Sequence, residues 1–303
     1  MAILVVGSVA FDTVQTPAGK AEEVLGGSAS YFAVAASFFS QVHLVAVVGQ
    51  DFTPDHGSIF RERGVETGGL ARLPGKTFRW SGVYGQDLNQ RTTLSTELNV
   101  FEHFRPELPE WLRKVEFLFL ANIDPELQRS VLRQMKRPRL VACDTMNFWI
   151  SGKPAEVRKT MEEVDILIIN DEEARQLAGE SNTVRAAKKI LSWGPSSLVV
   201  KRGEYGAALY NGRSLFAVPA YPLLDPVDPT GAGDSFAGGF LGYLARADRI
   251  DERSLRQALI TGSVMASFCV EDFSLRRFEQ LRPEEIRTRQ KEFSRMTEFE
   301  EIP

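Results

Sequence analysis

Short apolar runs, each followed by a segment with helical periodicity, constrain the fold of this chain more than any other feature. Each run has the length of a buried strand, and near-continuous runs such as Asp165–Asn170 are typical of a parallel sheet covered on both faces. The alternation predicts an α/β fold, a doubly wound and mostly parallel sheet flanked by helices. The expected strands are Ile3–Val6, His43–Val48, Glu116–Ala121, Arg139–Cys143, Asp165–Asn170 and Ser197–Lys201. The expected helices are Ser28–Ser40, Asp171–Ala178, Thr183–Ser192 and Asp234–Arg246.

The segment 67–96 departs from this alternation. It contains Gly68-Gly69, Pro74-Gly75 and Gly85, with strand-like alternation between them, and this pattern indicates hairpins. We expect a small antiparallel β flap, a lid, formed by strands within about residues 10–20 and 67–96. Such a flap would exclude water from a site at the edge of the main sheet.

Composition and charge narrow the classes of function. The chain has 303 residues, which we interpret as one domain, 1–303, that includes the lid. A net charge of −4 argues against a nucleic-acid partner. Two cysteines form no disulfide framework, and no apolar run has the length of a membrane span. We therefore expect a cytoplasmic protein without a membrane partner, whose tail, 283–303, forms a surface helix and a frayed end.

The sequence Asp228-Pro-Thr-Gly-Ala-Gly-Asp-Ser-Phe236 leads directly into an expected helix. Gly231 and Gly233 let backbone N–H groups converge at the helix N-terminus, where the helix dipole favours an anion. Asp234 lies beside this anion hole and is suited to accept a proton from a hydroxyl. A plain glycine-rich loop with Asp234 as helix cap is the alternative. A half-matching dinucleotide fingerprint leaves an oxidoreductase as a further interpretation, which the negative charge of Asp234 disfavours.

This segment closely resembles the C-terminal signature of the ribokinase-like (PfkB) carbohydrate kinases. Four further motifs follow the family's order across nearly the whole chain. They are Gly7-Ser-Val-Ala-Phe-Asp12, Gly26-Gly27-Ser28, Asn170-Asp-Glu-Glu173 and Lys201-Arg-Gly-Glu-Tyr-Gly206.

The resemblance implies an ATP-dependent kinase that transfers the γ-phosphoryl group to a hydroxyl of a sugar, nucleoside or related polyol. Asp234 would be the base that takes the hydroxyl proton. The N–H groups of Gly231, Ala232 and Gly233 would stabilise charge on the transferring group, because phosphoryl transfer depends mostly on positioning and electrostatics.

The resemblance also implies residues at the nucleotide. Asn170 would contact ATP and, with Glu173, would organise Mg²⁺ through water. Gly203 and Gly206 would let the backbone approach the nucleotide. Lys201 replaces the threonine often found there, and it would either reach a phosphate or remain a solvated lysine at a strand end.

Two further groups of residues carry implied roles. Asp228 and the carbonyl of Thr230 lie where some family members hold a monovalent cation such as K⁺. At the other end of the site, Asp12, Gly26 and Gly27 would hold substrate hydroxyls, since a carboxylate accepts more than one donor.

The substrate end departs from the ribokinase pattern. Ala10 and Tyr31 each replace an asparagine, and Ser28 replaces a lysine, so polar contacts to free ribose are missing or changed. Tyr31 and Phe11 would each offer an aromatic face to a nucleoside base, although both residues also fit a hydrophobic core.

Other residues of the flap have no assigned role. Arg79, Gln86, Asn89 and Arg91 would reach either the substrate or a partner subunit, and flaps of this family often mediate homodimers. The changed substrate end keeps one alternative open, a catalytically weak sugar or nucleoside sensor on the same fold.

Overall fold

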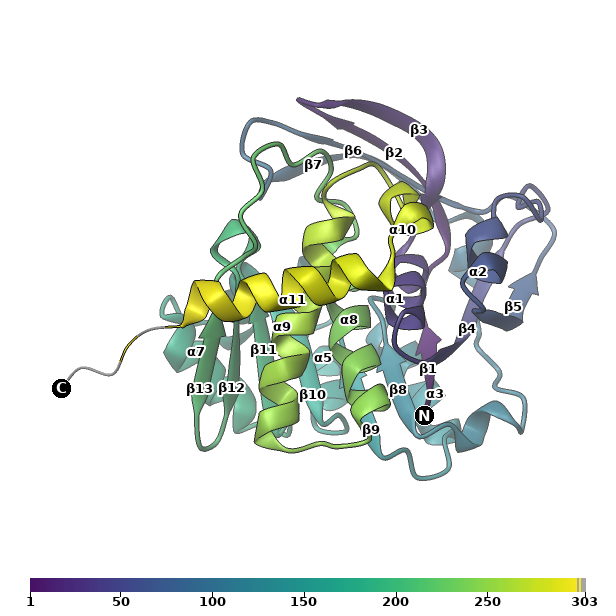
Figure 1. Cartoon of the computed structure of the whole chain (residues 1–303). Coiled ribbons are helices and arrows are strands. Elements are labelled where there is room, and N and C mark those ends of the chain that lie inside the picture. Colours follow the sequence, from purple (N-terminus) through teal and green to yellow (C-terminus); the bar gives the residue numbers. More distant parts are fainter. Residues whose placement is uncertain (299, 301–303) are drawn as a thin grey trace.

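A nine-stranded sheet forms the centre of this computed structural model, which describes residues 1–298 and 300 (Figure 1). Its strands are β1 (Ala2–Val6), β4 (Gln41–Val48), β5 (Glu66–Arg72), β8 (Phe117–Leu120), β9 (Leu140–Cys143), β10 (Ile166–Asn170), β11 (Ser197–Lys201), β12 (Ala207–Asn211) and β13 (Leu215–Val218). They follow the order β13-β12-β11-β10-β9-β8-β1-β4-β5. Only the β11–β12 and β12–β13 pairings are antiparallel, which confirms the mostly parallel sheet.

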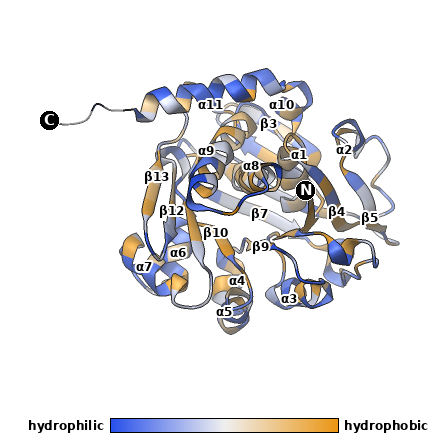
Figure 2. Cartoon of the chain, turned by 60° about the horizontal axis from the view of Figure 1, so that its bottom comes forward, coloured by the Kyte–Doolittle hydropathy of each residue, from blue (hydrophilic) through white to orange (hydrophobic). Residues whose placement is uncertain are grey.

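Helices cover both faces of this sheet (Figures 1 and 2). One face carries α1 (Ser28–Ser37), α2 (Ser58–Glu62), α8 (Ala232–Ala247) and α9 (Glu252–Cys269), with α10 (Arg276–Gln280) and α11 (Pro283–Thr297) packed against α9. The other carries α3 (Pro125–Gln134), α4 (Asn147–Gly152), α5 (Pro154–Met161), α6 (Asp171–Ala178) and α7 (Thr183–Leu191). Side chains alternate accordingly along β1, where Ile3 and Val5 join the first core and Leu4 and Val6 the second.

A second sheet forms the lid above the main sheet (Figure 1). Its strands are β2 (Ala10–Thr16), β3 (Gly19–Gly26), β6 (Phe78–Tyr84) and β7 (Arg91–Glu97), in the order β3-β2-β6-β7. Its outer pairings are antiparallel, as expected of the flap, whereas the central strands β2 and β6 run parallel.

The first part of segment 67–96 does not form a hairpin. It forms most of β5, which runs parallel to β4 at the edge of the main sheet after the crossover helix α2. The hairpin interpretation was wrong here, because α2 is only five residues long and leaves little helical periodicity in the sequence.

The expected tail helix is present as α11. It buries Ile286 and Phe293, and the guanidinium of Arg289 lies 3.6 Å from the ring centre of Phe268 on α9. The expected frayed end falls largely on residues 299 and 301–303, outside the described residues. Within residues 1–298 and 300, no helix has the length and hydropathy needed to cross a membrane.

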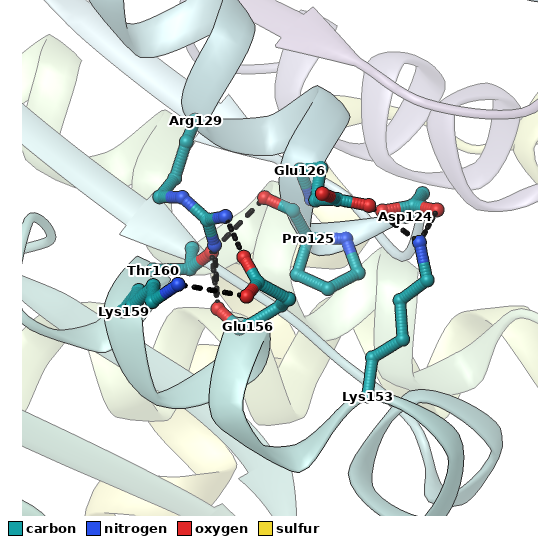
Figure 3. Close-up of polar contacts among 8 residues, drawn as sticks. All are labelled: Asp124, Pro125, Glu126, Arg129, Lys153, Glu156, Lys159 and Thr160. Atoms are coloured by element: carbon teal, nitrogen blue, oxygen red, sulfur yellow. Dashed lines mark hydrogen bonds and ion pairs between the residues drawn. The ribbon is translucent and has the colours of Figure 1, made fainter.

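An ion-pair network joins α3 to α5 on the second face of the sheet (Figure 3). Arg129, only 6% exposed, pairs with the carboxylate of Glu156 and donates to Thr160 Oγ1 at 3.0 Å. Lys159 pairs with the same carboxylate at 2.8 Å. The network fixes two helices that support the middle strands of the sheet.

Candidate active site

The candidate site lies at the carboxyl edge of the parallel strands. Asp144 directly follows β9, while Asn170 and Lys201 are the last residues of β10 and β11. Because the carboxyl ends of parallel strands meet at one edge, these residues converge where open α/β sheets bind ligands. The N-terminus of α8 reaches the same place, since Gly233 on its first turn lies beside Lys201.

The loop before α8 has the turn that its glycines predicted. Gly231 caps the helix with φ of 76°, and a Cβ there would lie 2.3 Å from the Tyr31 ring. The first N–H groups of a helix lack intrahelical partners. The N–H of Ala232 was expected to face the anion together with those of Gly231 and Gly233. It instead donates to the Pro229 carbonyl at 3.1 Å and closes a tight turn, so this expectation is corrected.

Asp234 lies on the first turn of α8 and points into this site. Burial, followed by the negative charge of Asp144, raises its pKa to about 8. The charges of Lys201 and Arg91 act in the opposite direction. A carboxylate with a pKa near neutrality is matched to proton transfer.

The side chain of Lys201 is only 16% exposed and lies beside the loop. Its Nζ donates to Asp144 Oδ2 at 3.0 Å and would lie 2.9 Å from a Cβ on Gly233. Burial lowers the pKa of Lys201, but the neighbouring carboxylates of Asp144, Glu173 and Asp234 raise it overall. The site therefore contains a fixed positive charge next to the predicted anion hole.

Asp144 is a residue that the sequence reasoning missed. It is 5% exposed, and its Oδ1 accepts the N–H of Thr145 at 2.7 Å. Its position directly after an expected buried strand was the available signal, because that position places a side chain at the ligand-binding edge.

Asn170 and Glu173 cap α6 reciprocally. Asn170 Oδ1 accepts the Glu173 N–H at 2.7 Å, and Glu173 Oε2 accepts the Asn170 N–H at 2.8 Å. Burial and the charge of Asp144 raise the pKa of Glu173 to about 7. Carboxylates suit Mg²⁺, but within residues 1–298 and 300 no three acidic, histidine or cysteine side chains form a direct ligand set. These residues fit a magnesium ion held through water and phosphate.

Asp12 lies across the site, on the lid strand β2. It is 4% exposed, accepts the Gly27 N–H, and packs so closely on Gly26 that a Cβ there would lie 1.9 Å from its Oδ2. Burial raises its pKa to about 7, and the charge of Asp228 acts in the same direction. The structure thus brings Asp12, Gly26 and Gly27 together.

Two expected substrate residues, Ser28 and Tyr31, are buried. Ser28 Oγ bonds with Ser8 Oγ at 3.1 Å, and this pair joins the start of α1 to the loop after β1. Tyr31 is 1% exposed and packs beneath Gly231, because α1 and α8 lie against each other. The expected contacts of Ser28 and Tyr31 with a substrate stay predictions.

Asp228 and Thr230 lie beneath the loop. Asp228 is 1% exposed, and its Oδ1 accepts the Thr230 N–H at 2.9 Å. Its Oδ2 is buried without a hydrogen-bond partner among the described residues. An orphaned buried carboxylate oxygen fits the expected cation.

The lid contacts both loops of the site. Tyr84 OH accepts a hydrogen bond from Thr230 Oγ1 at 3.2 Å, a contact that the sequence did not indicate. In the β6–β7 loop, Asn89 approaches the loop between β11 and β12 so closely that a Cβ on Gly203 would lie 1.9 Å from its Oδ1. In the loop between β11 and β12, Gly206 has φ of 91°, and a Cβ there would lie 2.0 Å from the Val218 carbonyl oxygen.

The two flap arginines, Arg79 and Arg91, differ in the carboxylates on which they act. Arg91 lowers the pKa of Asp12, Asp234 and Glu173, so its charge reaches both ends of the site. Arg79 instead pairs with Asp51 at 2.8 Å, away from these carboxylates.

The sequence of this chain is similar to those of known proteins. The pfkB family carbohydrate kinase model matches residues 2–280. A cytidine kinase of Thermococcus kodakarensis is 30% identical over 260 residues, which cover 82% of this chain and 91% of the relative.

Solved structures show the same fold. The nucleoside kinase of Burkholderia thailandensis, solved with inosine, superposes with a TM-score of 0.79 at 19% identity, covering 96% of this chain and 98% of that one. A ribokinase-like protein of Escherichia coli, solved with ATP and Mg²⁺, gives a TM-score of 0.79 at 19% identity, covering 96% and 99%. This chain belongs to the pfkB family of carbohydrate kinases and is a phosphotransferase with an alcohol group as acceptor.

Proposed function

We propose that this chain transfers the γ-phosphoryl group of ATP to a hydroxyl of a sugar, nucleoside or related polyol, with Asp234 as the base. One observation carries the proposal: Asp234 shares its site with the ammonium of Lys201 and the carboxylate of Asp12. Both charges act on the pKa of Asp234, and Lys201 lies against Gly233 of the loop.

Each end of the site has a distinct role in the reaction. The Asp12 carboxylate accepts hydrogen bonds from acceptor hydroxyls. Asp234 takes the proton of the attacking hydroxyl as its oxygen bonds to the γ-phosphorus, and cleavage of the bond to the β-phosphate oxygen releases ADP. The N–H groups of Gly231 and Gly233, with the Lys201 ammonium, stabilise the charge of the transferring group.

The nucleotide lies along the loop from Lys201 to Gly206, with Asn170 beside it. Asn170 and Glu173 hold Mg²⁺ through water, and the ion, when bound, neutralises phosphate charge. The support for this arrangement is the donor chemistry of the strand ends, including the buried carboxylate of Glu173.

Asp228 and the Thr230 carbonyl hold a monovalent cation. The orphaned Oδ2 of Asp228 supports this assignment. Initial rates in K⁺ against tetramethylammonium test it, and equal rates would contradict a role for the cation in turnover.

The lid forms a homodimer through its free edge. β7 is exposed along its whole length, and Leu94 on it is 64% exposed. An unpaired strand edge is suited to pairing with another chain. Light scattering measures the mass, which we expect to be that of two chains.

Asp234→Asn tests the central proposal, because it keeps the shape of the side chain and removes the base. We expect turnover, measured as ADP formation across a panel of sugars, nucleosides and polyols, to fall by about 10²–10⁴-fold. ATP binding, measured by calorimetry, should persist. Near-wild-type turnover in the variant would remove Asp234 from the role of base.

A further inference from the structure

One face of the lid looks into the site. Asp12 pairs in register with Trp80 on the neighbouring strand β6, and paired residues of adjacent strands project from the same face. Tyr84, four residues further along β6, accepts a hydrogen bond from Thr230 in the loop before α8, so this face of the lid points toward that loop. The neighbouring pair, Phe11 and Arg79, therefore projects from the opposite face.

Trp80 is held flat on this inner face. A Cβ on Gly82 would lie 2.3 Å from the indole, so only a glycine at that position lets the ring lie against the strand. The Trp80 Nε1–H donates to Thr93 Oγ1 at 3.4 Å. The guanidinium of Arg91 lies 5.9 Å from the ring centre. Trp80 is half-buried and lies on the same face of the lid as Asp12.

The surroundings of Asp12 offer little to a free sugar. Ala10 is fully buried, Ser28 is bonded to Ser8, and Tyr31 lies beneath Gly231. A site that cannot pair the hydroxyls of a ligand discriminates poorly in its favour. A planar base attached to a sugar held by Asp12 would instead find a fixed aromatic surface, and base–aromatic stacking contributes about 1–3 kcal/mol.

We propose that Trp80 is a specificity-determining residue that stacks on the planar base of a nucleoside whose ribose hydroxyls bind Asp12. This inference rests on the proposed function, which leaves the acceptor open among sugars, nucleosides and polyols. It selects the nucleosides, because free sugars and polyols carry no planar base.

The test compares acceptors that share the same hydroxyls. Cytidine, adenosine and inosine are assayed against 1,4-anhydroribitol, which has the ribose hydroxyls and no base, with wild-type protein, Trp80→Leu and Trp80→Phe. We expect Trp80→Leu to lower kcat/KM for the nucleosides by about 5- to 150-fold. The value for 1,4-anhydroribitol should not change, and Trp80→Phe should recover most of the loss. Trp111→Leu, at a tryptophan 52% exposed and packed near Gly68 of β5, is the matched control.

A merely structural role for Trp80 would lower both classes of acceptor together, and that result would overturn the inference. Wild-type protein with equal kcat/KM for 1,4-anhydroribitol and for the nucleosides would overturn it as well. Nucleoside binding is measured separately by calorimetry. If nucleosides bind in a manner that depends on Trp80 but no ADP forms, the proposed reaction is refuted and stacking on Trp80 is supported.

Discussion

The pH dependence of the reaction offers a direct test of Asp234 as the base. Burial and then the charge of Asp144 raise the pKa of Asp234 to about 8, so at pH 7 only about one-tenth of it is ionised. Asp144→Asn keeps the size of the side chain and an oxygen that accepts from Lys201 Nζ, but it removes the negative charge. The pKa of Asp234 should therefore fall.

The size of this effect follows from Coulomb's law. The negative charge of Asp144 acts on Asp234, and both carboxylates act on Lys201. Two unit charges about 7 Å apart, in an effective dielectric constant of about 20, interact by about 2 kcal/mol. Since one pKa unit is about 1.4 kcal/mol, the pKa of Asp234 should fall by about 1–2 units.

The assay measures kcat/KM for the acceptor from about pH 5.5 to about pH 9.5 at saturating MgATP, and a coupled reaction monitors the formation of ADP. A base must be ionised, so activity is lost as pH falls through its pKa, and the acidic limb should shift to lower pH in Asp144→Asn. Glu172→Gln, a similar change at an exposed position on α6, should leave the limb in place. An unmoved limb, or one shifted to higher pH, would refute the electrostatic coupling of Asp144 to the base.

Three further outcomes are expected. Asp12→Ala should raise KM for the acceptor by about 10- to 150-fold, because hydrogen bonds to a charged group are lost, and KM for ATP should stay constant. If steady-state kinetics showed the reverse, the assignment of the acceptor end and the ATP end of the site would have to be exchanged. Arg129→Met leaves the Glu156 carboxylate and Thr160 without their shared donor and should lower the free energy of unfolding in urea by about 1–3 kcal/mol; an unchanged midpoint would show that the network stabilises nothing. Burial raises the pKa of Asp12, Glu173 and Asp234, so each favours folding at low pH and loses that contribution as pH rises through about 7 to 8. The melting temperature of the protein without added ligand should fall from pH 5 to pH 8, less steeply in Asp234→Asn, and identical slopes in calorimetry would contradict this.

Local signals made part of the fold predictable. α6 begins and ends at the residues expected from the sequence, because an apolar strand ends at Asn170 and Glu173 completes a reciprocal cap. β5 gives no such signal. It is an edge strand with Gly68-Gly69 and mostly exposed side chains, so neither its burial nor its propensity separates it from a hairpin.

The site was predictable only where its residues lie within one continuous motif. Asp234 and Gly231 could be placed because a short loop and the helix after it determine their geometry. Arg79 and Arg91 look alike in sequence, yet one pairs with Asp51 while the other acts on the site carboxylates. The face on which each projects depends on strand register, and the β6–β7 pairing contains an irregularity between Ser81 and Gly82 that no local pattern reveals.

The lid and the loop before α8 are joined by hydrogen bonds in this structure. Thr230 bonds to Tyr84 of the lid and is covalently continuous with Gly231, the cap of the helix that carries Asp234. The same lid strand carries Trp80, and the following loop carries Asn89 against the nucleotide loop. A ligand that displaces the inner face of the lid therefore also displaces Tyr84, the hydrogen-bond partner of Thr230. Acceptor binding at the lid and the positioning of the base are thus coupled through hydrogen bonds between the lid and this loop, that of Thr230 with Tyr84 and that of Thr16 Oγ1 with the Val227 carbonyl at 2.8 Å.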